Sequence, residues 1–212
     1  MRARDQGATN ATYYRQNRSR EIARVRARQD ATRDMLRRLR SRPCLDCGEM
    51  FLAHQMDFDH REPSAKAFRL TSGRAMLASL SALAAEIKEC DVVCANCHRM
   101  RTRLRANHTP TSPSPAASRY LNRRRAYWQG QARLLDDLKG VPCADCGRRY
   151  ATCAMDFDHR RPDTKRYTVS RMIGRAGTAA IMAEVAKCDI VCANCHRDRT
   201  HRRRRGSASE RE

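Results

Sequence analysis

Hydrophobic residues recur along this chain at two spacings, one helical and one alternating. Residues 75–89 place leucine, methionine and isoleucine at helical spacing, which predicts an amphipathic helix whose apolar stripe is core. Residues 173–187 predict a second such helix, weakened by two glycines. Residues 50–59 and 150–158 alternate instead, so we expect strands in which Phe58 and its flanking aspartates point to opposite faces.

A second short strand is expected after each of these. Residues 66–71 and 165–170 would complete a hairpin with the preceding strand, ahead of the amphipathic helix. In a regular strand His60 would share the face of Phe58. Asp59 and His60 can therefore serve one site only where the backbone bends.

Long stretches rich in arginine predict a further set of helices. Residues 13–40 have a weak apolar stripe, contain neither Pro nor Gly, and end before Pro43. Residues 120–139 repeat that basic helix. Residues 94–105 and 192–205 begin as cysteine-containing turns and continue as arginine-rich helices.

The same cysteine-rich pattern occurs twice. Cys-Ala-Asn-Cys-His-Arg begins at Cys94 and again at Cys192, and each copy follows a Cys-x-x-Cys pair and an Asp-Phe-Asp-His tetrapeptide. The first cysteines of the two sets, Cys44 and Cys143, are 99 residues apart, whereas Cys94 and Cys192 are 98 apart. One single-residue deletion accounts for the difference. The chain is a tandem duplication, and one repeat predicts the function of both.

Composition limits how such small repeats can be stable. Charged residues make up 32% of the chain and aromatic residues 5%, so each repeat buries a thin core and needs a cross-link. Paired Cys-x-x-Cys motifs are typical of a closed four-cysteine zinc site, which contributes folding energy directly. A disulfide framework is the alternative and needs an oxidising compartment. The expected ligands of two structural Zn²⁺ ions are Cys44, Cys47, Cys94 and Cys97, and Cys143, Cys146, Cys192 and Cys195. The remaining cysteines, Cys90, Cys153 and Cys188, are interpreted as structural.

These patterns predict an α+β protein with two zinc-stapled domains. Pro, Ser and Thr dominate the stretch between them, which cannot pack and predicts a semi-extended spacer. The expected layout is a basic helical arm at 1–42, a zinc-stapled domain at 43–106, the linker at 107–119, a basic helix at 120–141, a second zinc-stapled domain at 142–205 and a polar tail at 206–212.

The net charge of +21 indicates the kind of partner. A surplus of this size favours nucleic acid, most of all DNA, with an anionic membrane as the weaker alternative. Residues 1–40 lack the apolar region of a signal peptide, and no stretch approaches the roughly 20 apolar residues of a membrane span. We therefore expect a cytoplasmic protein with reduced thiols. The sequence indicates no protein partner.

A histidine directly follows the last cysteine of each set. Successive helical residues diverge by about 100°, so if Cys97 faces the zinc, His98 faces a different site. Asp59 and His98 would offer an oxygen and a nitrogen to a divalent ion such as Mg²⁺ or Mn²⁺, which leaves His60 as a general base. The equivalents in the second repeat are Asp158, His196 and His159. The alternative is that Asp59 and His60 form a satisfied structural pair.

With these residues in place, the sequence resembles a known family. Cys-x-x-Cys, then Asp-His, then Cys-x-x-Cys-His-Arg is similar to the HNH endonucleases of the ββα-metal fold, most of all the small bacterial and phage branch with a four-cysteine zinc. The likeness covers about residues 43–105 and 142–203. It implies two tandem ββα-metal domains, each preceded by a basic helix.

The resemblance also implies a metal-dependent hydrolysis of DNA that leaves 5′-phosphate and 3′-hydroxyl ends. His60 and His159 would each activate a water, and Asp59, His98, Asp158 and His196 would hold one catalytic metal per repeat. One position departs from the family. Its central Asn, which helps orient the base, is missing from residues 88–91 and 186–189. Either another group orients the base, or activity is reduced.

Other polar residues of the motifs have expected roles too. Arg99, Arg197, Lys66 and Lys165 are predicted to neutralise phosphates, and Asn96 and Asn194 to cap the helix or the zinc loop. The alternative to a nuclease is a non-catalytic, zinc-stapled nucleic-acid-binding protein, or a chain with one active and one degenerate repeat.

Overall fold

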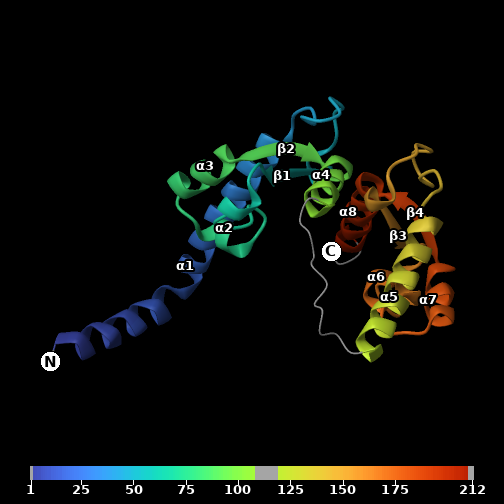
Figure 1. Ribbon diagram of the computed structural model, residues 1–212. Helices are drawn as coiled ribbons and strands as arrows, with labels where there is room; N and C mark the ends of the chain where they lie inside the picture. Colours follow the sequence, from blue (N-terminus) through green and yellow to red (C-terminus); the bar gives the residue numbers. More distant parts are fainter. Residues whose placement is uncertain (1, 108–118, 210–212) are drawn as a thin grey trace. The chain divides into compact units, whose positions relative to one another are not determined.

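The computed structural model describes residues 2–107 and 119–209, so most of the expected linker lies outside the described residues (Figure 1). It combines helices with two-stranded sheets, an α+β arrangement, in two similar repeats that each hold a four-cysteine cluster. Two compact units are present: compact unit 1 contains Met1–Arg42 and Phe58–Val92, and compact unit 2 contains Pro43–Asp57 and Val93–Glu212. Each is described by itself below.

This division differs from the boundaries at 43–106 and 142–205 that the sequence predicts. The first repeat's cysteine turn and closing helix belong to compact unit 2 because they pack on the second repeat. The helix α4 (Ala95–Asn107) contacts η3 (Thr152–Ala154), and α8 (Ala193–Ser209) contacts η1 (Ala53–Gln55).

The two repeats have the same order of elements. The first contains α1 (Arg2–Arg40), β1 (Met56–His60), α2 (Gly73–Leu77), α3 (Leu80–Lys88), β2 (Cys90–Cys94) and α4. The second contains α5 (Arg119–Leu138), β3 (Met155–His159), α6 (Val169–Met172), α7 (Thr178–Val185), β4 (Cys188–Cys192) and α8. Helix α1 begins earlier than the expected residue 13, and α8 extends through Ser209 into the expected tail.

The predicted strands at 66–71 and 165–170 are wrong. β1 pairs instead with β2 and β3 with β4, the latter antiparallel with Met155 opposite Cys192 and His159 opposite Cys188. Residues 166 and 167 give their backbone N–H groups to the Glu184 carboxylate rather than to a neighbouring strand, at 2.9 and 3.4 Å. Two strands followed directly by a helix, β3–β4–α8, therefore make up the second repeat's centre, and α8 contacts both strands.

The predicted amphipathic helix at 75–89 is divided in two. The break falls at Ser79, whose Oγ accepts a hydrogen bond from Ala82 N at 3.2 Å and so caps α3. The helix predicted at 173–187 is shorter and begins only at Thr178, after Gly174, which has a φ of +72° in the segment between α6 and α7. The predicted apolar stripes are core in part: Leu83 and Ile181 are each 1% exposed, whereas Leu77 and Leu80, beside the break at Ser79, are 60% and 72% exposed.

The basic helices add their weak apolar stripes to these cores. In compact unit 1, Leu36 of α1 packs with Leu70, Ala75, Met76 and Leu83. In compact unit 2, Leu135 of α5 packs with Val169, Met172, Ile181 and Cys188, and a separate cluster contains Cys143, Met155, Val191 and Cys192. Two motif cysteines of the second repeat are thus part of a small core. No helix in the described residues is both long enough and apolar enough to span a membrane.

Gly174→Ala is expected to destabilise the second repeat. An added Cβ would lie 2.5 Å from Trp128 Nε1, and the φ of +72° costs an L-residue about 1–2 kcal/mol. Gly130→Ala is the matched control, because a Cβ there meets nothing within 4 Å and the site is helical. Chemical denaturation should show lower stability for Gly174→Ala only. Equal stability of the two variants would contradict the prediction.

Candidate metal centres and hydrolytic site

Each repeat brings its four motif cysteines to one point. The Sγ atoms of Cys44, Cys47, Cys94 and Cys97 lie within 4.8 Å of one another, as do those of Cys143, Cys146, Cys192 and Cys195. Zinc bonded to four sulfurs at about 2.3 Å places those sulfurs about 3.8 Å apart, so either cluster could hold a zinc ion. All eleven cysteines lie among the described residues and all are free, which is contrary to the disulfide alternative.

Backbone amides surround the sulfurs. Cys192 N donates to Cys143 Sγ at 3.2 Å, and Gly147 takes a φ of +68° in the turn that follows Cys146, a conformation that glycine adopts without strain. Burial raises the pKa of the Cys143 thiol, but backbone N–H groups of Cys146 and Cys192 outweigh it and bring the pKa to about 7. Amide donors of this kind stabilise the thiolate form that binds metal.

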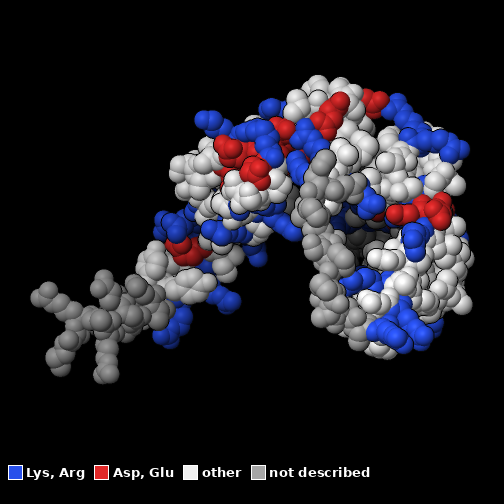
Figure 2. All heavy atoms as spheres, in the orientation of Figure 1, with Lys and Arg blue, Asp and Glu red and all other residues white. Residues whose placement is uncertain are grey.

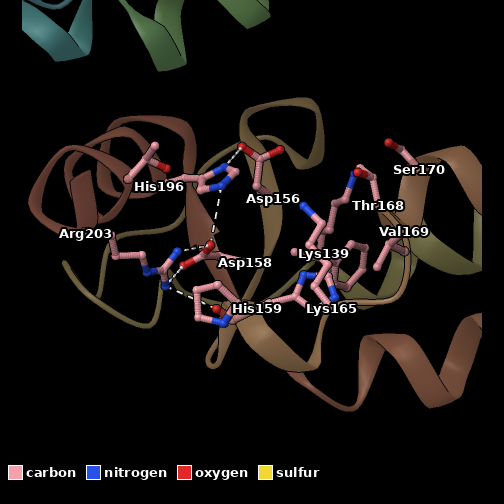
Figure 3. A pocket seen from close by; sticks show the side chains of 13 residues that line it. Lys139, Asp156, Asp158, His159, Lys165, Thr168, Val169, Ser170, His196 and Arg203 are labelled. Atoms are coloured by element: carbon pink, nitrogen blue, oxygen red, sulfur yellow. Dashed lines mark hydrogen bonds and ion pairs between the residues drawn. The ribbon is translucent and has the colours of Figure 1, made fainter. Parts of the chain in front are cut away.

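A second, separate site lies in the second repeat, within compact unit 2. A cavity of about 230 Å³ is lined by residues of β3, of α8 and of the segment leading into α6 (Figure 3). Asp158 and His159 both line it, and each is 4% exposed, although they are neighbours on one strand. Burial therefore departs from strict alternation at the end of β3, where the sequence requires a bend.

His159 is held by a carboxylate from α7. Its Nε2 lies 2.8 Å from Glu184 Oε1, and both side chains are buried. The hydrogen bond from Lys187 Nζ lowers the pKa of Glu184 most; burial opposes it, and the Arg166 N–H and His159 add to it, leaving the pKa at about 2. An ionised carboxylate only accepts hydrogen bonds, so His159 Nε2 carries the proton and Nδ1 keeps a free lone pair.

His196 is oriented in the same way by Asp156, as Figure 3 shows. Its Nδ1 lies 2.7 Å from Asp156 Oδ2. Burial raises the pKa of Asp156, but hydrogen bonds from His196 and Arg99 outweigh it and lower the pKa to about 2. Nδ1 therefore donates a proton to Asp156, and Nε2 lies 3.4 Å from Asp158 Oδ1.

This pair of atoms fits a shared divalent cation. His196 Nε2 and Asp158 Oδ1 lie 3.4 Å apart, a distance that either an ion pair with the protonated imidazole or a shared cation accommodates. Two ligands bound at about 2.1 Å and at roughly tetrahedral or octahedral angles are about 3.0–3.4 Å apart. An imidazole nitrogen with a carboxylate oxygen suits Mn²⁺ and related ions.

The Asp158 carboxylate also accepts hydrogen bonds from two guanidinium groups. Arg203 donates to Oδ1 and Oδ2 at 2.8 Å, and Arg199 donates to Oδ2 at 3.1 Å. Burial raises the pKa of Asp158, and the Arg203 and Arg199 hydrogen bonds lower it below its usual value. A cation bound here would therefore share this carboxylate with, or displace, the arginines.

The first repeat has matching contacts in each compact unit. In compact unit 1, His60 Nε2 lies 2.6 Å from Glu86 Oε1, and Asp59 is 3% exposed. In compact unit 2, His98 Nδ1 lies 2.8 Å from Asp57 Oδ2. The orienting carboxylates Glu86 and Asp57 thus recur at the positions of Glu184 and Asp156.

The predicted phosphate-binding cations have different surroundings. Lys165 is exposed and lines the cavity, and Lys66 is exposed. Arg99 and Arg197 instead contact carboxylates: Arg99 Nη1 lies 2.6 Å from Asp156 Oδ1, and Arg197 Nη2 lies 2.7 Å from Asp57 Oδ2. Each of these guanidinium groups thus donates to a largely buried aspartate, and the phosphate contact stays a prediction.

Sequence reasoning missed the four orienting carboxylates. Glu86 and Glu184 each follow a buried core residue, Leu83 or Ile181, by three positions, so an acidic residue on the apolar helix face was the available signal. Asp57 and Asp156 were visible in the repeated tetrapeptide, where only the second aspartate was assigned a role.

Comparisons with protein-family models, with curated proteins and with solved structures found no match to this chain. The observed α+β repeats, the paired cysteine clusters and the His–carboxylate cavity therefore carry any functional conclusion by themselves.

Proposed function

We propose that this protein is a metal-dependent endonuclease of the HNH type that hydrolyses DNA phosphodiester bonds. The observation that carries the proposal is the cavity of the second repeat, which His159, Asp158 and His196 line together. One histidine has its Nε2 fixed by Glu184, and the other has its Nε2 3.4 Å from the Asp158 carboxylate. This arrangement separates a base from a cation site within one cavity.

The side chains can then perform each part of a hydrolysis. His159 Nδ1 takes a proton from a water, whose oxygen attacks phosphorus while the bond to the 3′ oxygen breaks and that oxygen leaves. Lys165 at the cavity edge offers a cation to the phosphate. A divalent ion held by Asp158 and His196 would supply Lewis acidity to the phosphate and the leaving oxygen. In the sequence, the repeated motif gives His60, Asp59 and His98 as the corresponding residues of the first repeat.

The charge of the chain supports a nucleic-acid substrate. Lys and Arg outnumber Asp and Glu by 44 to 23, and their side chains are spread over the face shown in Figure 2. Phosphate contacts of this kind bind without regard to sequence and weaken as salt rises.

One observation favours the non-catalytic alternative. Arg199 and Arg203 already neutralise Asp158, as they would in a zinc-stapled binding protein that needs no second metal. The two functions are separated by supplying purified protein with supercoiled plasmid DNA and Mg²⁺ or Mn²⁺. Nicked and linear products with 5′-phosphate ends support the nuclease. A gel-shift without any cleavage, at all ion concentrations tested, would leave only the binding protein.

Glu184→Gln is expected to slow cleavage by the second repeat by roughly 10- to 100-fold, as loss of an outer hydrogen-bond partner does elsewhere. The amide can donate to His159 Nε2 and so place the proton on Nδ1, where the base is needed. The assay uses a His60→Ala background, in which residual nicking reports the second repeat.

Asp137→Asn is the control for Glu184→Gln, because Asp137 is an exposed acid on α5 that does not line the cavity. It should nick at the parent rate. Thermal melting checks that Glu184→Gln remains folded. Unchanged nicking by a folded Glu184→Gln protein would mean that Glu184 does not set the proton position of His159.

A further inference from the structure

Within compact unit 2, side chains of each repeat form hydrogen bonds with the other repeat, and these contacts are reciprocal. Asn96 N, at the start of α4, donates to Asn194 Oδ1 at 3.3 Å, and Asn194 N, at the start of α8, donates to Asn96 Oδ1 at 3.2 Å. Each asparagine is 2% exposed. The asparagines thus cap helices, as the sequence predicts, but each caps the helix of the other repeat.

Two arginines also contact the opposite repeat. Arg99 of the first repeat contacts Asp156 of the second at 2.6 Å, and Arg197 of the second contacts Asp57 of the first at 2.7 Å. Both aspartates are largely buried, with side chains 21% and 16% exposed. A symmetric pair of contacts at residues outside either cysteine cluster indicates a specific interface rather than incidental surface pairing.

Each crossed aspartate also orients a histidine of its own repeat. Asp156 Oδ1 accepts from Arg99 while its Oδ2 accepts from His196 Nδ1 at 2.7 Å. The guanidinium of one repeat therefore fixes the carboxylate that fixes the imidazole of the other. Asp57 stands in the same way between Arg197 and His98.

We propose that Arg99 and Arg197 are positioning residues that act in trans: Arg99 sets His196 through Asp156, and Arg197 sets His98 through Asp57. The proposal rests on the nuclease function above. Each hydrolytic site is completed by the other repeat, so that the pair of repeats, not the single repeat, is the working unit. The opposite assignment is a role in cis, in which each arginine serves its own repeat and contacts a phosphate beside the histidine that precedes it.

The test isolates one site at a time. His98→Ala removes a proposed metal ligand of the first repeat, so residual cleavage and residual Mn²⁺ binding both report the second. His196→Ala is the mirror background. In each, Mn²⁺ affinity is measured by the electron paramagnetic resonance of free Mn²⁺, and cleavage by plasmid nicking under single-turnover conditions.

In the His98→Ala background, Arg99→Ala should weaken Mn²⁺ binding and lower the nicking rate by about tenfold each, with Arg99→Lys intermediate. Arg197→Ala should act in the His196→Ala background instead. Arg148→Ala is the matched control in both, since Arg148 makes an exposed ion pair with Glu49 of the other repeat, at 2.6 Å, away from the cavity. Zinc content and melting temperature confirm that each variant is folded.

The outcomes separate the two proposals. If Arg99→Ala lowers Mn²⁺ binding and nicking more in the His196→Ala background, Arg99 serves its own repeat and the trans role is overturned. Equal effects in both backgrounds would reduce it to general stability and overturn it too. If no protein nicks DNA but Mn²⁺ binding follows the crossed pattern, the nuclease fails and the trans role holds. If neither background binds Mn²⁺, the trans role fails as well.

Discussion

Alanine at both His60 and His159 is expected to abolish plasmid cleavage, with the rate falling by roughly 1000-fold or more. A positioned general base contributes about 10²–10⁴-fold, and the double substitution removes it from both repeats. Each single variant should keep about half the nicking activity, because the other repeat retains its base. DNA binding should persist, since neither imidazole supplies a phosphate contact.

The matched control for this pair is His54→Ala. His54 is a partly buried histidine that contacts Asp198 at 3.1 Å, and it does not line the cavity. The His54→Ala protein should cleave DNA at the parent rate. Cleavage by the folded His60→Ala/His159→Ala protein at the parent rate would rule out both histidines as general bases and remove the proposed mechanism. Melting curves exclude unfolding, which matters because both histidines are buried.

Loss of one cysteine cluster is expected to unfold the repeat that contains it. Structural zinc supplies about 10–16 kcal/mol in small zinc-binding peptides, more than the total stability of most domains. In the second repeat, Cys143 and Cys192 form part of a small core cluster with Met155 and Val191, so the metal and the core are lost together. The wild-type chain should contain about two zinc ions and the Cys143→Ser/Cys192→Ser chain about one.

Cys153→Ser provides the comparison, because Cys153 is only partly buried and belongs to neither cluster. It should keep both zinc ions and the parent circular dichroism spectrum. Removal of one cluster should also lower the melting temperature of the remaining repeat, because Asn194 directly follows the Cys192–Ala193 pair and caps α4. Two zinc ions in the double serine variant would contradict the assignment of the ligands.

The cysteine clusters were predictable because the spacing of Cys-x-x-Cys pairs is a strong constraint on its own. The amphipathic helices were predictable for the same reason: Leu83 and Ile181 lie on stripes that only a buried face explains. The strand β2 was not, since Cys90–Cys94 is five residues long and its pairing depends on a partner strand that ends 30 residues earlier, at His60. Residues 66–71 had a comparable local pattern and were chosen wrongly.

The site was predictable in part. The Asp-His pairs and the histidines after Cys97 and Cys195 were visible as motifs, whereas Glu86 and Glu184 reach them from a different element. The roles of Arg99 and Arg197 could not be read from either repeat alone, because their partners lie in the other copy. Contacts between copies leave no periodic signal in the sequence.

The reciprocal asparagine caps determine how the pairing of the two repeats depends on protein concentration. A protein with one such repeat would have to find a second molecule to form these caps, and dilution would separate the two. Here both copies belong to one polypeptide, so the second partner is held at an effective concentration set by the connecting segment, which is in the millimolar range for short tethers. The assembled pair should therefore persist at the few molecules per cell at which a bimolecular version would fall apart.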